Sequence, residues 1–104
     1  MTSTAIAGRE VQVDAEGFLT DPQQWDEAVA AKLAERIGLE LTEDHWKAIR
    51  FARSDFAATG ETPTLRRMAN TGGVSTKDMF TLFPKKPAKK LSYVAGLPKP
   101  VGCV

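Results

Sequence analysis

From residue 21 onward, helix start and stop signals divide the chain into short segments. Asp21-Pro22 and Thr62-Pro63 each place a side-chain acceptor before a proline, which suits the first turn of a helix. Gly38 and Gly60 are suited to end helices, because glycine readily adopts the left-handed conformation found there. Pro84 stops a later segment. We therefore expect about five short helices.

Apolar residues give the expected helices one buried face each. Trp25, Val29, Leu33 and Ile37 recur every four residues, which predicts a first helix from Asp21-Pro22 to Ile37. Tryptophans at such spacing are core residues, and we expect the same of Trp46. The remaining helices are expected at residues 42–60, 62–70, 75–83 and 87–94.

The segment before residue 20 has the alternation of strands instead. Ala5–Ala7 and Glu10–Val13 flank Gly8-Arg9, a two-residue connection that predicts a tight hairpin. Phe18-Leu19 is expected to add a short third strand. Because strands precede helices rather than alternate with them, the fold class is α+β: a small N-terminal β-hairpin or meander packed on an array of helices.

Composition narrows the class of protein further. A chain of 104 residues, 42% of them hydrophobic, supports one small domain. It shows neither a signal-peptide pattern nor an apolar run long enough to span a bilayer, and its single cysteine excludes an internal disulfide or a structural zinc site. We expect a cytoplasmic protein without membrane association.

The charge is unevenly distributed along the chain. Residues 1–45 hold ten acidic and three basic side chains, a balance of −7, whereas residues 46–104 have a balance of +8. Two interpretations remain open: the basic half attracts an acidic partner, protein or nucleic acid, or the two halves attract each other within the fold.

Few residues have the pattern of a catalytic site. The single histidine, His45, is expected to be a partly exposed helix residue, with general-base catalysis as the other interpretation. Lys47, Arg50 and Arg53 lie three apart and are expected to share a solvated or protein-docking face. With the short helix that follows, they also fit a helix-turn-helix, so direct DNA binding is a less favoured alternative.

The C-terminal tail carries the one plausible nucleophile, Cys103. A lone cysteine is usually buried, but this one ends a segment rich in proline and glycine, which is hard to bury. We therefore predict a domain at residues 1–94 and a mobile arm at residues 95–104 that presents the thiol to partners. The thiolate is the reactive form. Lys99 on the arm and four cations on the domain are candidates for its electrostatic support if the arm folds back: Arg66, Arg67, Lys89 and Lys90. The other arm residues are Gly96, Leu97, Pro98, Pro100 and Gly102.

Several segments together resemble the DsrC/TusE family of sulfur-trafficking proteins. They are Gly17-Phe18-Leu19 before Trp25, Leu41-Thr42-Glu43-Asp44-His45-Trp46, Pro63-Thr64-Leu65-Arg66, Leu82-Phe83-Pro84 with Pro87-Ala88-Lys89, and the tail from Ala95 to Val104.

The resemblance implies a β-meander on helices and a sulfur-relay carrier whose Cys103 holds a persulfide. Partners lend most of the catalytic machinery to this sulfurtransferase-type reaction, and no cofactor or metal is needed. In the TusE branch the sulfur reaches a tRNA 2-thiouridine through a separate thiouridylase. The implied partners are a TusBCD-like complex, a thiouridylase or a sulfite reductase.

Two positions and one segment depart from the family pattern. Ser92 stands where members that serve dissimilatory sulfite reductase have a second cysteine, which favours the single-cysteine, TusE-like branch. Residues 70–78 form a shorter segment than in the family, which puts the usual donor in doubt, and Lys86 replaces a glycine. The alternatives are a DsrC-like partner of sulfite reductase, a sulfur-responsive regulator that binds DNA, and an adaptor whose thiol is incidental.

Overall fold

A computed structural model describes residues 2–99 of the chain. Its element order is β1 (Thr2–Ile6), β2 (Arg9–Val13), the 3-10 helix η1 (Pro22–Gln24), α1 (Glu27–Arg36), α2 (Glu43–Thr59), α3 (Leu65–Asn70), α4 (Thr76–Leu82) and α5 (Pro87–Val94). The α+β class and the five short α-helices are confirmed.

The N-terminal strands form an antiparallel hairpin whose loop lies one residue earlier than the sequence indicated. Ile6 pairs with Arg9, so the loop is Ala7-Gly8 rather than Gly8-Arg9. Both loop residues have positive φ, 53° and 76°, as the tight turns that match strand twist require. The expected third strand is reduced to a single bridge between Val13 and Leu19.

The predicted first helix is divided at Trp25. Asp21 caps only the 3-10 helix η1, and Trp25 then has extended backbone, with φ −106° and ψ 146°. Asp26 starts α1 by accepting a hydrogen bond from the Val29 amide at 2.8 Å. Two short helices, each capped by its own aspartate, therefore form in place of the single long helix that the sequence predicted. Trp25 leaves the helix, stays partly buried, and its indole N–H donates to the Val94 carbonyl at 2.9 Å.

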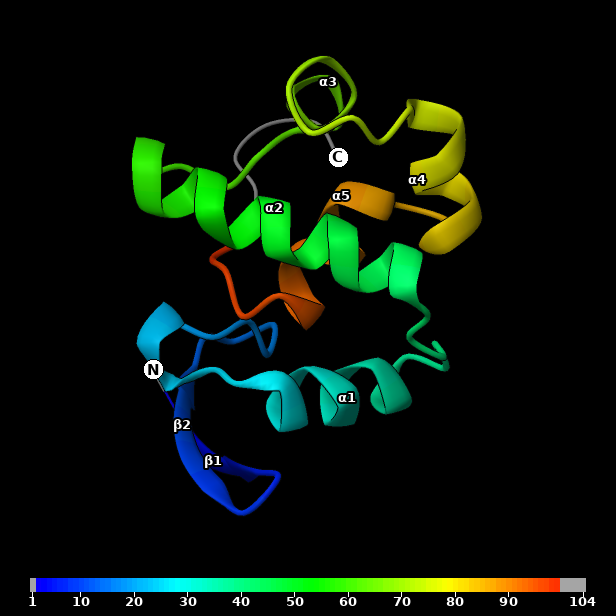
Figure 1. Cartoon of the computed structure of the whole chain (residues 1–104). Helices are drawn as coiled ribbons and strands as arrows, with labels where there is room; N and C mark the ends of the chain where they lie inside the picture. Colours follow the sequence, from blue (N-terminus) through cyan, green and yellow to red (C-terminus); the bar gives the residue numbers. More distant parts are fainter. Residues whose placement is uncertain (1, 100–104) are drawn as a thin grey trace.

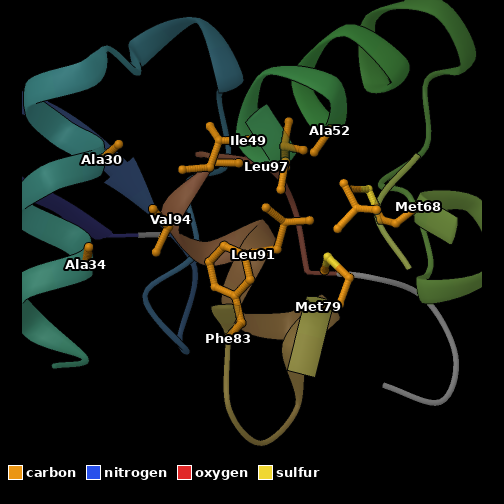
Figure 2. Packing of buried hydrophobic residues seen from close by; sticks show 13 residues of the cluster. Ala30, Ala34, Ile49, Ala52, Met68, Met79, Phe83, Leu91, Val94 and Leu97 are labelled. Carbon is orange, nitrogen blue, oxygen red and sulfur yellow. The ribbon is translucent and has the colours of Figure 1, made fainter. Parts of the chain in front are cut away.

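Helix α5 forms the centre of the domain, between α1 and α2 (Figure 1). The hairpin lies on the other side of α1 and forms a smaller core with it, made of Ile6, Val11, Val13, Leu19, Val29 and Leu33. The larger core joins α2, α5 and the chain that follows α5. Figure 2 shows Leu97 directed into this core with Ile49 and Leu91.

His45 is buried, contrary to expectation, with 7% of its surface exposed. Its Nδ1 accepts the Thr42 amide hydrogen at 3.1 Å, and its Nε2 lies 2.7 Å from the Leu82 carbonyl. The Thr42 bond requires a bare Nδ1, so the hydrogen is on Nε2 and is donated to Leu82. His45 therefore closes the N-terminus of α2 and ties it to the end of α4, which gives this residue a structural rather than a catalytic role.

Candidate functional site at the root of the arm

The chain beyond α5 is packed against the domain as far as it is described. Ala95, Gly96 and Leu97 are buried, and the Leu97 amide donates to the Ser92 carbonyl at 3.0 Å. We call residues 95–99 the arm root. The predicted sulfur-carrying residue Cys103, with Pro100 and Gly102, lies outside the described residues.

Gly96 lets the arm root pass directly over Trp25. Its φ is +70°, and a Cβ placed there would lie 2.4 Å from Cδ1 of the indole ring. No side chain fits at that distance, so only glycine permits both the turn and the close contact. The tryptophan ring is held by its bond to Val94, which leaves it little freedom to move aside.

Arg53 fixes the same turn from the other side. Its guanidinium donates to the carbonyls of Ala95 at 2.7 Å and Pro22 at 2.9 Å. It also lies 4.1 Å from the centre of the Trp25 ring, as in a cation–π contact. Burial lowers the pKa of Arg53 below its ordinary value. The prediction that Arg53 shares a solvated face with Lys47 and Arg50 is therefore wrong for this residue.

Thr62 holds the next part of the arm root. The sequence predicted that Thr62 begins the third helix, but Thr64 is the cap: its hydroxyl accepts the Arg67 amide hydrogen at 3.2 Å. The Thr62 hydroxyl instead donates to the Pro98 carbonyl at 2.9 Å. A groove of about 410 Å³ runs beside this contact and is lined by Phe56, Gly60, Glu61, Thr62, Thr64, Pro98 and Lys99.

An ion pair supports the loop on which Thr62 lies. Arg67 donates through Nε and Nη2 to both oxygens of the buried Asp55, at distances between 2.7 and 3.2 Å. This bond raises the pKa of Arg67 above its ordinary value. Arg67 therefore joins α3 to α2, whereas its neighbour Arg66, a candidate for supporting the thiolate, is exposed on α3.

Glu16 forms the last anchor of the arm root. Its carboxylate lies 2.7 Å from the Lys99 ammonium and 3.5 Å from that of Lys89. The hydrogen bond from Lys99, with a smaller contribution from Lys89, lowers the pKa of Glu16 below its ordinary value, although burial opposes this shift. The structure therefore brings together two of the five predicted supporting cations, whereas Arg67 is paired with Asp55 instead. Each of the two is paired with Glu16, so part of its field is neutralised.

These anchors limit where the thiol can be. Lys99 is tied to the domain, and Cys103 follows it by four residues. Four residues of extended chain span at most about 14 Å, which is the largest distance between the two Cα atoms. If Cys103 carries the chemistry, as the sequence predicts, the reaction takes place near Thr62, Glu16 and Lys99. Glu16 and Thr62 were not identified as site residues from the sequence, whereas Lys99 was predicted as part of the arm.

Ser92, the position of the missing second cysteine, is enclosed by α5. Its side chain is 1% exposed, and its hydroxyl donates to the Ala88 carbonyl at 2.7 Å. Ser92 therefore has a satisfied structural role inside the helix. Its own carbonyl also holds the arm root through Leu97.

Comparisons with known proteins identify the family of this chain. From residue 5 to residue 104 the chain matches the family described as "DsrC like protein". The chain belongs to the DsrC family. Two relatives named "Sulfurtransferase TusE", from Salmonella typhimurium strain LT2 and Escherichia coli strain K12, are 39% and 38% identical to it, and each match covers 93% of this chain and 95% of the relative.

Solved structures of the DsrC family have the same fold. The NMR structure of Allochromatium vinosum DsrC has a TM-score of 0.80 at 35% identity, covering 98% of this chain and 97% of the other. The oxidized gamma-subunit of dissimilatory sulfite reductase (DsrC) from Archaeoglobus fulgidus has a TM-score of 0.78 at 38% identity, covering 99% and 100%. Within residues 2–99, no helix is both long and apolar enough to cross a membrane.

Proposed function

We propose that this DsrC-family protein is a sulfur-relay carrier that accepts sulfane sulfur on Cys103 and passes it to a downstream acceptor. The observation that carries the proposal is a single thiol, four residues beyond a firmly anchored arm root, in a chain about 39% identical to proteins named as sulfurtransferases. In this proposal the domain at residues 1–94 anchors the arm at residues 95–104, and Cys103 on the arm carries the sulfur.

The loading reaction is a thiol–persulfide exchange. The Cys103 thiolate attacks the terminal sulfur of a donor persulfide, a new S–S bond forms, and the donor leaves as a thiolate. The proton on the terminal sulfur stays with it, so Cys103 becomes a persulfide without net oxidation. Unloading repeats the exchange with an acceptor thiolate. The reaction uses no cofactor or metal of this chain.

The arm root contributes position and charge to this exchange. Lys99 immediately precedes the terminal segment, and Lys89 is bound to the same carboxylate as Lys99. Cations favour the thiolate over the thiol. The shared partner of the two lysines, Glu16, weakens the effect. The exposed Arg66 is a further candidate for supporting the thiolate when the arm approaches α3.

The name shared by the relatives supports the TusE-like branch of the family. We propose that a TusBCD-like complex is the donor and that a thiouridylase, which forms 2-thiouridine in tRNA, is the acceptor. The relay belongs in the cytoplasm, where thiols are kept reduced. Ser92 supports this branch, because a chain with one cysteine cannot form an internal disulfide.

A role beside sulfite reductase is the second candidate, favoured by the likeness to the gamma-subunit of Archaeoglobus fulgidus. It predicts binding to the reductase without an internal disulfide. Direct DNA binding by a sulfur-responsive regulator has less support, because Arg53 of the expected basic face is engaged with the arm root.

The test is transfer of sulfur to the intact protein. The protein is incubated with a cysteine desulfurase, cysteine and pyridoxal phosphate, with and without purified TusBCD-like proteins, and then analysed by mass spectrometry. We expect a gain of one sulfur atom on Cys103, lost on reduction, and no gain in Cys103→Ser. Failure to load from any sulfurtransferase, with the fold intact, would refute the carrier function.

A further inference from the structure

We propose that a groove along α5 is the docking site for an acidic segment of the sulfur donor, an inference that rests on the proposed carrier function. The groove has a volume of about 370 Å³. Besides Glu16, its lining consists of three apolar or aromatic residues, Phe18, Ile37 and Tyr93, which we call the floor, and three lysines, Lys86, Lys89 and Lys90, which we call the rim. We call it the α5 groove.

The groove and the arm root share Glu16. This residue lines the groove, and its carboxylate lies 2.7 Å from the Lys99 ammonium. A partner seated in the groove is therefore next to the point from which the terminal segment departs. Since Cys103 lies within about 14 Å of Lys99, the bound partner is also within reach of the thiol.

The charge of the groove selects an acidic occupant. Three lysines surround it, and Glu16, its one acidic lining residue among those described, is already paired with Lys89 and Lys99. An acidic segment complements this positive charge and is steered toward the groove, whereas a basic one is repelled.

The floor favours a protein segment over nucleic acid. Phe18 and Tyr93 meet edge to face with ring centres 5.6 Å apart, and Ile37 completes an apolar surface that an apolar side chain can cover. A ribose–phosphate backbone would instead place charged phosphate groups against this apolar surface, which is unfavourable. A sulfur acceptor that binds tRNA needs a basic surface around its site, so the acidic partner is the donor.

Lys86, one of the rim lysines, has an unfavourable backbone conformation. Lys85 and Lys86 both have left-handed backbone, with φ 58° and 47°, which is unfavourable for residues with a Cβ. Lys86 also precedes Pro87, a position that favours extended backbone. Glycine would relieve this strain, so the lysine at position 86 brings a charge to the groove at the expense of stability.

The two strained lysines provide a matched pair of variants. Lys86→Gly removes a rim charge, whereas Lys85→Gly removes a neighbouring charge that does not line the groove in the described structure. Both relieve a left-handed residue, so both are expected to raise the urea midpoint of unfolding. Loss of binding in Lys86→Gly alone therefore cannot result from misfolding.

The first probe is a labelled hexapeptide with two glutamates on each side of a leucine–phenylalanine pair. We expect it to shift the NMR signals of the groove residues, with binding weakened about two- to fivefold in Lys86→Gly and little changed in Lys85→Gly. Peptides with glutamine in place of glutamate, or serine in place of the apolar pair, should bind more weakly. Shifts spread over all basic surfaces, equal effects of the two variants, no binding, or preferential binding of an RNA hairpin would each refute the proposal.

The second probe separates docking from sulfur chemistry. Loading of Cys103 by limiting donor protein should slow in Lys86→Gly but not in Lys85→Gly, while loading by inorganic polysulfide should be equal in both. Equal loading rates with the donor protein would refute the docking site even if the carrier function holds. If Cys103 loads from neither source, the carrier function fails, and the peptide experiment still decides whether the groove binds acidic segments.

Discussion

Replacing Arg53 with methionine tests whether this side chain fixes the arm root. Methionine keeps much of the apolar stem, but the Ala95 and Pro22 carbonyls lose donors now at 2.7 and 2.9 Å. A hydrogen bond from a charged donor contributes about 1.5–3 kcal/mol. The variant no longer pays the desolvation cost of the partly buried cation, and this gain offsets part of the lost stability. We therefore expect the free energy of unfolding to fall by about 2–4 kcal/mol.

The assay combines urea unfolding with hydrogen exchange at the Leu97 amide, which is bonded to Ser92 in the arm root. Arg53→Met should accelerate exchange at this amide. Arg50→Met is the matched control, because Arg50 lies on the same helix, is 69% exposed, and is 3.9 Å from Glu27. We expect the control to lose less than about 0.5 kcal/mol. Equal losses in the two variants, or unchanged Leu97 exchange in Arg53→Met, would refute the reasoning.

Three further predictions concern two anchors of the arm root, Gly96 and Glu16, and the capping residue His45. Gly96→Ala should lower stability by about 2–4 kcal/mol, because it combines left-handed strain with overlap on Trp25, and the tryptophan fluorescence should change with it. His45→Ala should cost about 2–4 kcal/mol in urea unfolding, since it deletes packed volume and two hydrogen bonds; a loss below 1 kcal/mol would contradict the capping role. The pKa of Glu16 is lowered in the folded state, so its stabilising effect is present above the ordinary value of 4.5 and is lost as the pH falls through the folded value. The difference in the free energy of unfolding between the native protein and Glu16→Gln should therefore vanish in acid. The amide hydrogen-exchange rates of Lys99 in the two proteins should then also become alike. A difference in stability that is the same at all pH values would exclude the ion pair as its cause.

Local signals predicted most of the helices correctly. The helices expected at residues 75–83 and 87–94 are confirmed as α4, which Ser75 caps, and α5, which starts at Pro87. Such start signals depend on neighbouring residues only. The first helix was predicted too long because Trp25 fits an apolar period of four. A second cap at Asp26 and a bond to Val94, 69 residues away, draw it out of the helix. Such a distant competitor leaves no local pattern.

The predicted thiol lies outside the described residues and stays a prediction, and most residues that anchor the preceding chain were not predictable. The composition around Cys103 predicted an exposed thiol, and the family resemblance gave it a function. The residues that anchor the tail join distant parts of the chain: Thr62 and Pro98 are 36 positions apart, and Arg53 and Ala95 are 42 apart. Arg53 was assigned to a solvated face because charge spacing does not show which cation a neighbouring carbonyl will bind. The opposite charges of the two halves do meet, where Glu16 pairs with Lys89 and Lys99.

The ion pair between Glu16 and Lys99 limits the reach of the terminal segment, and this limit has a consequence for the kinetics of the relay. A folded partner of about 100 residues is roughly 30 Å across, about twice the distance over which the terminal segment can extend. Two such proteins cannot surround one thiol at the same time. Donor and acceptor must take turns, each leaving before the other arrives, so steady-state transfer should give the parallel double-reciprocal plots of a ping-pong scheme.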